Sequence, residues 1–355
     1  MNAALGIQQD DERQERLSLI RDSAAAMVPR DGDLSRIRAL RFTTEGMDRE
    51  SWRQICAMGW VGLRLDEEAG GIGLGAAELA ALLEELGKGL LPEPLIEAVM
   101  VAGLLPPDLC QQQLSGVRLI MPAGLAQPAR LEVRDGQLTG QLDNVSLAAV
   151  ADAFVVNTCQ GLVLVEASSA TIHVDCQLTQ DGGHLGCLHF NATPVRRLDV
   201  SESRLAAILD EASLATSAYL LGCMQGAFVR TLEYLKVRKQ FGQAIGSFQV
   251  LQHRMVDLNI QIELSRAAIE QAAASIDSGT STGQRELHVS AARLRTTRAA
   301  LKVCREAIQL HGAIGYTDEA DIGLFLRKVL TLMNTCGSLQ YHQQRYTTWV
   351  CEEVH

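Results

Sequence analysis

The sequence RKQFGQAIGSFQ, at residues 238–249, joins two long segments of helical spacing. Apolar residues recur every three or four positions on both sides of it, from Leu214 to Leu235 and from Leu251 to Ile276. Three further helices are expected over about 285–310, 322–333 and 338–350. Four or five long helices in succession indicate an antiparallel helical bundle in this part of the chain.

Two glycine-containing turns predict a different architecture before the bundle. Residues 130–143 alternate around Asp135-Gly136, and the short apolar runs 153–156 and 162–165 flank Gln160-Gly161. Such dipeptides between β-favouring segments are typical of hairpins. With one more strand expected at 171–174, this stretch predicts a small antiparallel β domain.

The N-terminal stretch has the spacing of helices, at about 48–63, 76–86 and 95–105. We therefore expect an α+β fold with three domains. These are a helical domain at residues 1–117, a β domain at 118–202 and a helical bundle at 203–355.

Composition narrows the class of protein. The formal net charge of -10 disfavours binding to nucleic acid, since an acidic surface repels phosphate backbones. Nine dispersed cysteines without a CxxC pair fit reduced thiols, and they give neither a disulfide framework nor a metal site. The acidic N-terminus does not resemble a signal peptide, and no apolar run is long enough to span a bilayer. We expect a cytoplasmic protein without membrane insertion.

A second motif, QLHGAIGYT at residues 309–317, follows the third expected bundle helix. Together with the 238–249 segment, about 70 residues earlier, it resembles the acyl-CoA dehydrogenase family. EEAGGIGL at 67–74 is similar to a turn in that family's N-terminal domain, and LPEPL at 91–95 and VADAFVV at 150–156 are similar to its steroid-catabolic branch. The resemblance covers nearly the whole chain. It implies FAD-dependent α,β-desaturation of a bulky acyl-CoA thioester, such as one carrying a steroid side chain.

The resemblance implies that both motifs reach FAD across a subunit interface. An acidic protein needs a positioned cation for a pyrophosphate, and an arginine offers planar, charge-assisted hydrogen bonds. The implied cofactor contacts are Arg238, Gln240, Phe241, Phe248, Gln249, Gln309, Gly312 and Ala313.

Simpler interpretations of these residues stay open. Arg238 could bind carbonyls at a helix end, the two phenylalanines could belong to the core, and Gly312 could be a helix cap. Ala313 stands where relatives often have glycine. The glycine run at 70–75 is expected to be a structural turn, because no strand precedes it and no Lys-Ser/Thr follows.

The catalytic base of the family has no clear counterpart. In most members a glutamate stands about 27 residues after the glutamine of the second motif, which leads here to Cys336. Some relatives place the base 13 residues before the position of Gln225, which leads to Ala212. Glu211 is adjacent, but one residue turns a helical side chain by about 100°. Glu211 is therefore a weak candidate, and Cys336 is interpreted as a vacated base position.

The middle segment departs from the family as well, since the loops after Met121 look short for gripping flavin and thioester. These two departures predict a division of labour. In some steroid-catabolic relatives two homologous chains form an α2β2 heterotetramer, in which one brings the base and the other completes FAD binding. The expected partners are such a homologous subunit, the acyl-CoA substrate and an electron-transferring flavoprotein. The alternatives are an autonomous homotetrameric dehydrogenase that uses Glu211, and a flavin-free scaffold or regulatory subunit.

Overall fold

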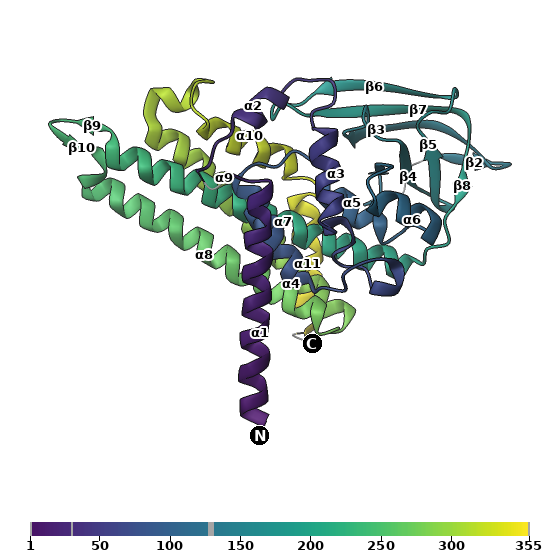
Figure 1. Ribbon diagram of the computed structural model, residues 1–355, viewed down its shortest axis with the longest axis horizontal. Coiled ribbons are helices and arrows are strands. Elements are labelled where there is room, and N and C mark those ends of the chain that lie inside the picture. Colours follow the sequence, from purple (N-terminus) through teal and green to yellow (C-terminus); the bar gives the residue numbers. More distant parts are fainter. Residues whose placement is uncertain (1, 30, 127–130, 354–355) are drawn as a thin grey trace. The chain divides into compact units, whose positions relative to one another are not determined.

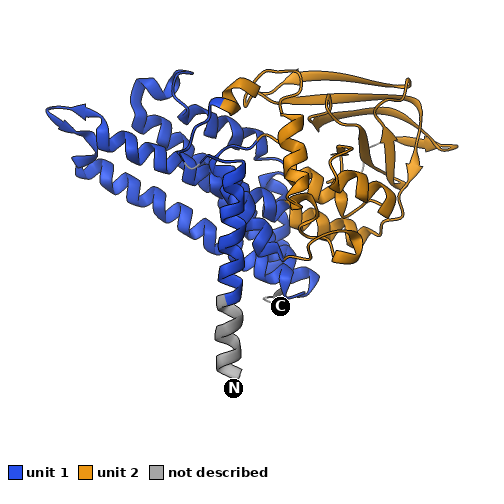
Figure 2. Ribbon diagram, viewed as in Figure 1, with its two compact units in different colours: residues 1–35, 75–91, 213–355 blue, residues 36–74, 92–212 orange. Residues whose placement is uncertain are grey.

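The computed structural model describes residues 2–29, 31–126 and 131–353, with side chains over the same ranges except at 2–11, 352 and 353. The chain divides into two compact units, coloured separately in Figure 2. Unit 1 comprises residues 1–35, 75–91 and 213–355, and unit 2 comprises residues 36–74 and 92–212. A single long helix, α7 (Glu202–Val237), begins in unit 2 and continues through unit 1.

Unit 1 is helical. Its helices are α1 (Asn2–Ser23), α4 (Ala76–Lys88), the larger part of α7, α8 (Gln249–Asp277), α9 (Thr282–His311), α10 (Ile322–Leu332) and α11 (Leu339–Glu353). The short 3-10 turns η1 (Ala24–Ala26), η4 (Ile245–Ser247) and η5 (Gly312–Tyr316) and the two-stranded pair β9 (Lys239–Gln240) and β10 (Gln243–Ala244) connect them. The five helices predicted for the C-terminal region are confirmed (Figure 1).

Two glycines let α4 and α7 touch backbone to backbone. A Cβ on Gly222 would lie 2.0 Å from the carbonyl oxygen of Glu84, and one on Gly87 would lie 2.1 Å from that of Tyr219. Any larger residue would push the helices apart. The contact fixes α7 inside unit 1, where Leu220, Leu221 and Met224 are fully buried.

The ends of the bundle helices follow their sequence signals. Ser278 ends α8, and the Ser281 side chain caps α9 by accepting a hydrogen bond from the Gln284 amide at 3.4 Å. Helix α9 ends at Gly312, whose φ of +68° is a conformation that glycine adopts without strain.

Unit 2 holds two four-stranded sheets. Its strands are β1 (Ile120–Ala123), β2 (Glu132–Arg134), β3 (Gln137–Ser146), β4 (Ala153–Thr158), β5 (Gly161–Glu166), β6 (Ile172–Leu178), β7 (His184–Pro194) and β8 (Arg196–Arg197). One sheet has the order β1-β4-β5-β8 and the other β2-β3-β7-β6. Both predicted hairpins are confirmed, because Arg134 pairs with Gln137 and Thr158 pairs with Gly161. All pairs are antiparallel within the described strands except β1 with β4, which run parallel.

Helices cover the remaining parts of unit 2. They are α2 (Ser35–Leu40), α3 (Arg49–Ala57), α5 (Leu95–Ala102) and α6 (Pro107–Leu114), with the 3-10 turns η2 (Trp60–Gly62) and η3 (Glu67–Ala69). The helix expected over 48–63 is shorter than predicted. Asp48 caps its start, but Gly59 has a φ of +75° and turns the chain out of the helix.

The first bundle helix also differs from its prediction. It begins at Glu202 rather than near Leu214, so Glu211 lies well inside α7. By length and composition α7 is the one helix among the described residues that could cross a membrane, but 78% of its most apolar window is buried inside the protein. Its apolar character is therefore explained by its place in the core.

Candidate functional site

The connection between α7 and α8 is a tight hairpin that projects from the ends of both helices (Figure 1). Gln240 of β9 pairs with Gln243 of β10, so Phe241 and Gly242 form a two-residue loop. Their φ angles of +53° and +80° are both left-handed, as in the turn type whose twist matches a hairpin. The Ile245 amide then donates a hydrogen bond to the Arg238 carbonyl at 2.8 Å and closes the loop.

The hairpin exposes the residues that the sequence analysis assigned to the cofactor. Phe241 is 92% exposed, and its only ring partner among the described residues is Phe248, edge-to-face at 6.3 Å. The side chains of Arg238, Gln240 and Gln249 are exposed as well. Within the described part of the chain, no hydrogen bond or ion pair involves the Arg238 guanidinium. The interpretation of Phe241 as a core residue does not fit this exposure, whereas a solvated Arg238 at the end of α7 does.

The second motif lies at the end of α9. Gln309, Gly312 and Ala313 are exposed, and a Cβ on Gly312 would meet nothing within 4 Å. Gly315 differs, because it is buried and a Cβ there would lie 2.6 Å from the carbonyl oxygen of Ile308. Gly315 is therefore required for packing within η5.

An aromatic contact joins the two motifs. The rings of Tyr234 on α7 and His311 on α9 stack at 4.4 Å, and the Tyr234 hydroxyl donates a hydrogen bond to the His311 carbonyl at 3.2 Å. Burial lowers the pKa of His311 and favours the neutral imidazole. The ends of α7 and α9 are thereby held together, with Arg238 four residues beyond Tyr234 and Gln309 two residues before His311.

In the glycine-rich turn at 67–74, three backbone amides donate hydrogen bonds to carbonyls just before the turn. The amides of Gly71, Ile72 and Gly73 donate to the carbonyls of Asp66, Gly62 and Leu65, respectively. A Cβ on Gly71 would lie 2.1 Å from the Leu65 carbonyl oxygen. The glycines serve a compact turn, and these three amides are not available to a phosphate.

Glu211, the candidate base, is held by an arginine within unit 2. The Arg64 Nε donates to Glu211 Oε2 at 3.0 Å, and its Nη2 donates to Oε1 at 2.9 Å. Both side chains are partly buried, at 19% and 26% exposure. A bidentate pair of this kind fixes the carboxylate and engages both of its oxygens. Sequence reasoning did not find Arg64, because 147 residues separate the partners and neither lies in a motif.

Cys336, the expected base position, lies in a constrained loop between α10 and α11. It has a φ of +57°, and Gly337 follows with +118°. The Cys336 carbonyl accepts hydrogen bonds from the Ser213 hydroxyl at 3.4 Å and from His342 Nε2 at 3.1 Å. The loop thus presents a thiol, and no carboxylate, on a backbone that α7 and α11 hold.

A buried arginine lies beneath this loop. Arg293 on α9 is 1% exposed, and its Nη2 donates to the carbonyls of Leu332 and Thr335 at 2.7 and 2.9 Å. Its Nε and Nη1 find no partner among the described residues, and burial lowers its pKa to about 10. A signal for it exists in the sequence, since Arg293 shares the apolar face of α9 with Val289 and Ala300.

With this geometry described, the comparisons with known proteins identify the class. The chain matches the N-terminal domain of acyl-CoA dehydrogenases over residues 14–105 and their C-terminal domain over residues 204–347. It is 30% identical over 329 residues to acyl-CoA dehydrogenase IpdE2 of Mycobacterium tuberculosis, which covers 88% of this chain and 91% of that protein.

Solved structures agree in fold. The Tcur3481-Tcur3483 steroid ACAD has a TM-score of 0.84 at 27% identity, over 97% of this chain and 99% of that one. The ChsE4-ChsE5 complex from Mycobacterium tuberculosis has a TM-score of 0.83 at 25% identity, over 96% and 97%. The chain belongs to the acyl-CoA dehydrogenase family, whose members are oxidoreductases that act on CH–CH bonds. The predicted family and fold class are confirmed.

The buried imidazole of His342 gives a test of the loop around Cys336. Burial first, and then the charge of Arg293, lower its pKa from 6.5 to about 4. Between pH 6.5 and pH 4 the unfolded chain binds a proton at this residue and the folded protein does not. Stability therefore falls as the pH drops through this window, by up to about 3 kcal/mol, and the loss levels off below pH 4.

The measurement is the free energy of unfolding against pH for the parent chain and for His342→Asn. The variant should lose this part of the pH dependence, while its packing cost appears alone above pH 7. Identical slopes below pH 6.5 in both proteins would show that His342 is not held neutral.

Proposed function

We propose that this chain is one subunit of an FAD-dependent acyl-CoA dehydrogenase and contributes cofactor contacts instead of the catalytic base. The substrate is a bulky acyl-CoA thioester, such as one with a steroid side chain. One observation carries the proposal. Arg238 lies exposed in the hairpin at 238–249, without a hydrogen bond or ion pair among the described residues, in a chain that has the thiol of Cys336 at the position where the resemblance places the base of most relatives.

The exposed residues of the hairpin at 238–249, together with Gln309, Gly312 and Ala313, form an edge that suits the anionic part of a dinucleotide. The Arg238 guanidinium has no hydrogen bond or ion pair among the described residues, and a guanidinium can bind a pyrophosphate through charge-assisted hydrogen bonds. Gln309 offers a paired donor and acceptor, and Gly312 leaves the backbone open to a ligand. Phe241 and Phe248 give an apolar surface, and Gln240, Gln249 and Ala313 complete the edge. Bound FAD supplies the acceptor for the hydride that leaves the β-carbon of the substrate.

An edge exposed to this extent fits a cofactor that is seated mainly in another subunit. Leaving a phenylalanine 92% exposed forfeits the free energy gained by burying its ring, which is about 2 kcal/mol. A neighbouring chain that covers the hairpin would recover this free energy. We infer that Arg238 and Gln309 reach a flavin held largely by that neighbour.

The α-proton of the substrate must then be taken by a group other than Cys336. Abstraction of an α-proton requires a carboxylate poised above the substrate, with its pKa raised towards neutrality. Cys336 offers no carboxylate. Glu211 is tied to Arg64 through both oxygens, so both are engaged in hydrogen bonds. We infer that a homologous partner supplies the base within an α2β2 assembly.

Two relatives support a partner of this kind. The Tcur3481-Tcur3483 steroid ACAD and the ChsE4-ChsE5 complex each pair two named chains, and one of them acts on a steroid by its name. A cytoplasmic location and an electron-transferring flavoprotein as acceptor complete the proposal. The three domain boundaries predicted from the sequence also remain proposals.

Purification with and without a homologous partner chain tests the proposed function. We expect the chain alone to be colourless and inactive, and the co-expressed pair to bind flavin and to desaturate an acyl-CoA. Native mass spectrometry should give an α2β2 mass with flavin. Yellow, active protein from the chain alone would support the homotetramer, and a pair that binds no flavin would support the scaffold.

Arg238→Ala tests the cofactor edge. Loss of a charge-assisted contact should weaken flavin binding of the pair by roughly tenfold to a hundredfold. The flavin-to-protein ratio at limiting FAD measures this effect. Lys236→Ala is the matched control, because it removes a nearby exposed cation that is already paired with Glu233. Equal flavin loss in both variants would argue against a specific role for Arg238.

Glu211→Gln separates the two proposed sources of the base. We expect turnover of the pair to stay within about twofold, whereas removing a catalytic carboxylate costs roughly a hundredfold or more. The free energy of unfolding should fall by about 1 kcal/mol as the ion pair with Arg64 is lost. Cys336→Ala should likewise leave turnover nearly intact. A collapse of turnover in Glu211→Gln would support the autonomous dehydrogenase.

A further inference from the structure

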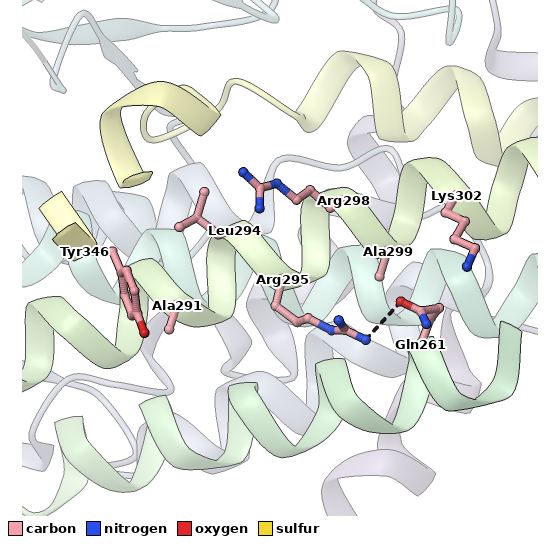
Figure 3. A pocket seen from close by; sticks show the side chains of 8 residues that line it. All are labelled: Gln261, Ala291, Leu294, Arg295, Arg298, Ala299, Lys302 and Tyr346. Carbon is pink, nitrogen blue, oxygen red and sulfur yellow. Dashed lines mark hydrogen bonds between the residues drawn. The ribbon is translucent and has the colours of Figure 1, made fainter. Parts of the chain in front are cut away.

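A second cationic surface lies on α9, away from the hairpin. Arg295, Arg298 and Lys302 project within an arc of roughly 60° on this helix, at 100° per residue. They line a pocket of about 370 Å³ together with Gln261 of α8 and Tyr346 of α11 (Figure 3). The remaining lining residues are the apolar Ala291, Leu294 and Ala299, so no carboxylate lines the pocket.

The charges of these three side chains are not neutralised. Arg295 Nη2 donates to the amide oxygen of Gln261 at 2.9 Å, and Arg298 Nη2 donates to that of Gln343 at 3.3 Å. A neutral amide satisfies a donor but leaves the positive charge in place. In the described part of the chain, Lys302 makes no hydrogen bond or ion pair.

Two other cations of these helices have carboxylate partners. Arg254 on α8 pairs with Glu306 through its Nε at 3.0 Å, and Arg345 on α11 pairs with Glu286 at 3.2 Å. Although the chain has a net charge of -10, no ion pair with a carboxylate involves these three cations among the described residues. Their mutual repulsion is relieved when an anion binds among them.

One donor is already desolvated. The Nε of Arg295 is buried and has no hydrogen-bond partner among the described residues, although the guanidinium lines the pocket. Burying a polar group without a partner is costly, so an acceptor placed there would be favoured. Figure 3 shows Arg295 and Lys302 directed towards Gln261, with Arg298 extending towards Leu294.

We propose that this pocket binds a phosphate-bearing small molecule, with the diphosphate of a nucleotide or of coenzyme A held by Arg295, Arg298 and Lys302. Guanidinium groups match the geometry of phosphate oxygens, and a lysine adds a compact charge. The volume lies at the lower end of the range for small-molecule sites and admits one such group. Tyr346 offers an aromatic face and a hydroxyl at the rim.

The pocket is distinct from the proposed cofactor edge. Lys302 and Gln309 are seven residues apart on the same helix, or roughly 10 Å along its axis. Anion binding at the pocket therefore does not depend on the proposed flavin contacts. An acidic segment of a partner subunit is the competing occupant. A small concave pocket with a buried, unsatisfied donor favours a compact ligand over an extended protein surface.

Calorimetric titration of the full chain, alone and in its complex, with inorganic pyrophosphate tests the proposal. We expect one pyrophosphate per chain. Lys302→Gln and Arg298→Gln should each weaken binding about tenfold, since each removes one charge-assisted contact from an exposed side chain. Arg134→Gln is the matched control, because it removes the same charge from β2 of unit 2, which contributes no residue to the pocket, and it should leave binding unchanged. All titrations are made in the Arg238→Ala background, so that the proposed cofactor edge does not add a second pyrophosphate site.

Competition by ADP and by coenzyme A identifies the source of the diphosphate. Displacement by both at similar concentration indicates a nucleotide site, and much tighter displacement by coenzyme A indicates the coenzyme. Absence of pyrophosphate binding to the parent chain would overturn the proposal, as would equal weakening by Arg134→Gln. Loss of subunit assembly in Lys302→Gln, without any pyrophosphate binding, would overturn it in favour of an acidic partner segment.

Discussion

The backbone contact between α4 and α7 is the constraint on which the bundle depends. Gly222 and Gly87 bring the two helices closer than any side chain would allow, and α7 becomes a fixed spine of unit 1. The hairpin with Arg238 projects from its end, and the stack of Tyr234 on His311 ties that end to α9. The exposed edge is therefore held by a rigid scaffold, which lowers the entropy cost of binding a ligand there.

Much of the fold follows from local signals in the sequence. The hairpins at Asp135-Gly136 and Gln160-Gly161, and the helix end at Gly312, need only short-range chemistry. The start of α7 was missed because Glu202, Ser203 and Arg204 are polar and exposed, and the buried polar residues Asp210 and Ser213 interrupt the apolar period. The break at Gly59 was missed because the apolar pattern continues through a change of backbone conformation.

The residues of the candidate site also divide into those that the sequence predicts and those that only the fold brings together. Motif residues such as Arg238 and Gln309 could be assigned by resemblance, and their exposure agrees with a role at an edge. Arg64 and Arg293 could not, because their partners lie far away in the sequence and only the folded chain brings them together. The two arginines also differ in their partners. Arg64 pairs with the carboxylate of Glu211, whereas the buried Arg293 donates to backbone carbonyls.

The surroundings of Cys336, the position that the sequence predicts as a vacated base site, bear on that prediction. The Cys336 carbonyl is bound by Ser213 and His342, so the loop cannot easily reorient its side chain. Arg293 donates to the neighbouring Thr335 carbonyl and brings a buried positive charge to this loop. A carboxylate restored at residue 336 would be stabilised in its charged form by that cation, whereas the base needs a pKa raised towards neutrality. The surroundings that α9 and α11 provide at residue 336 therefore do not suit a carboxylate base.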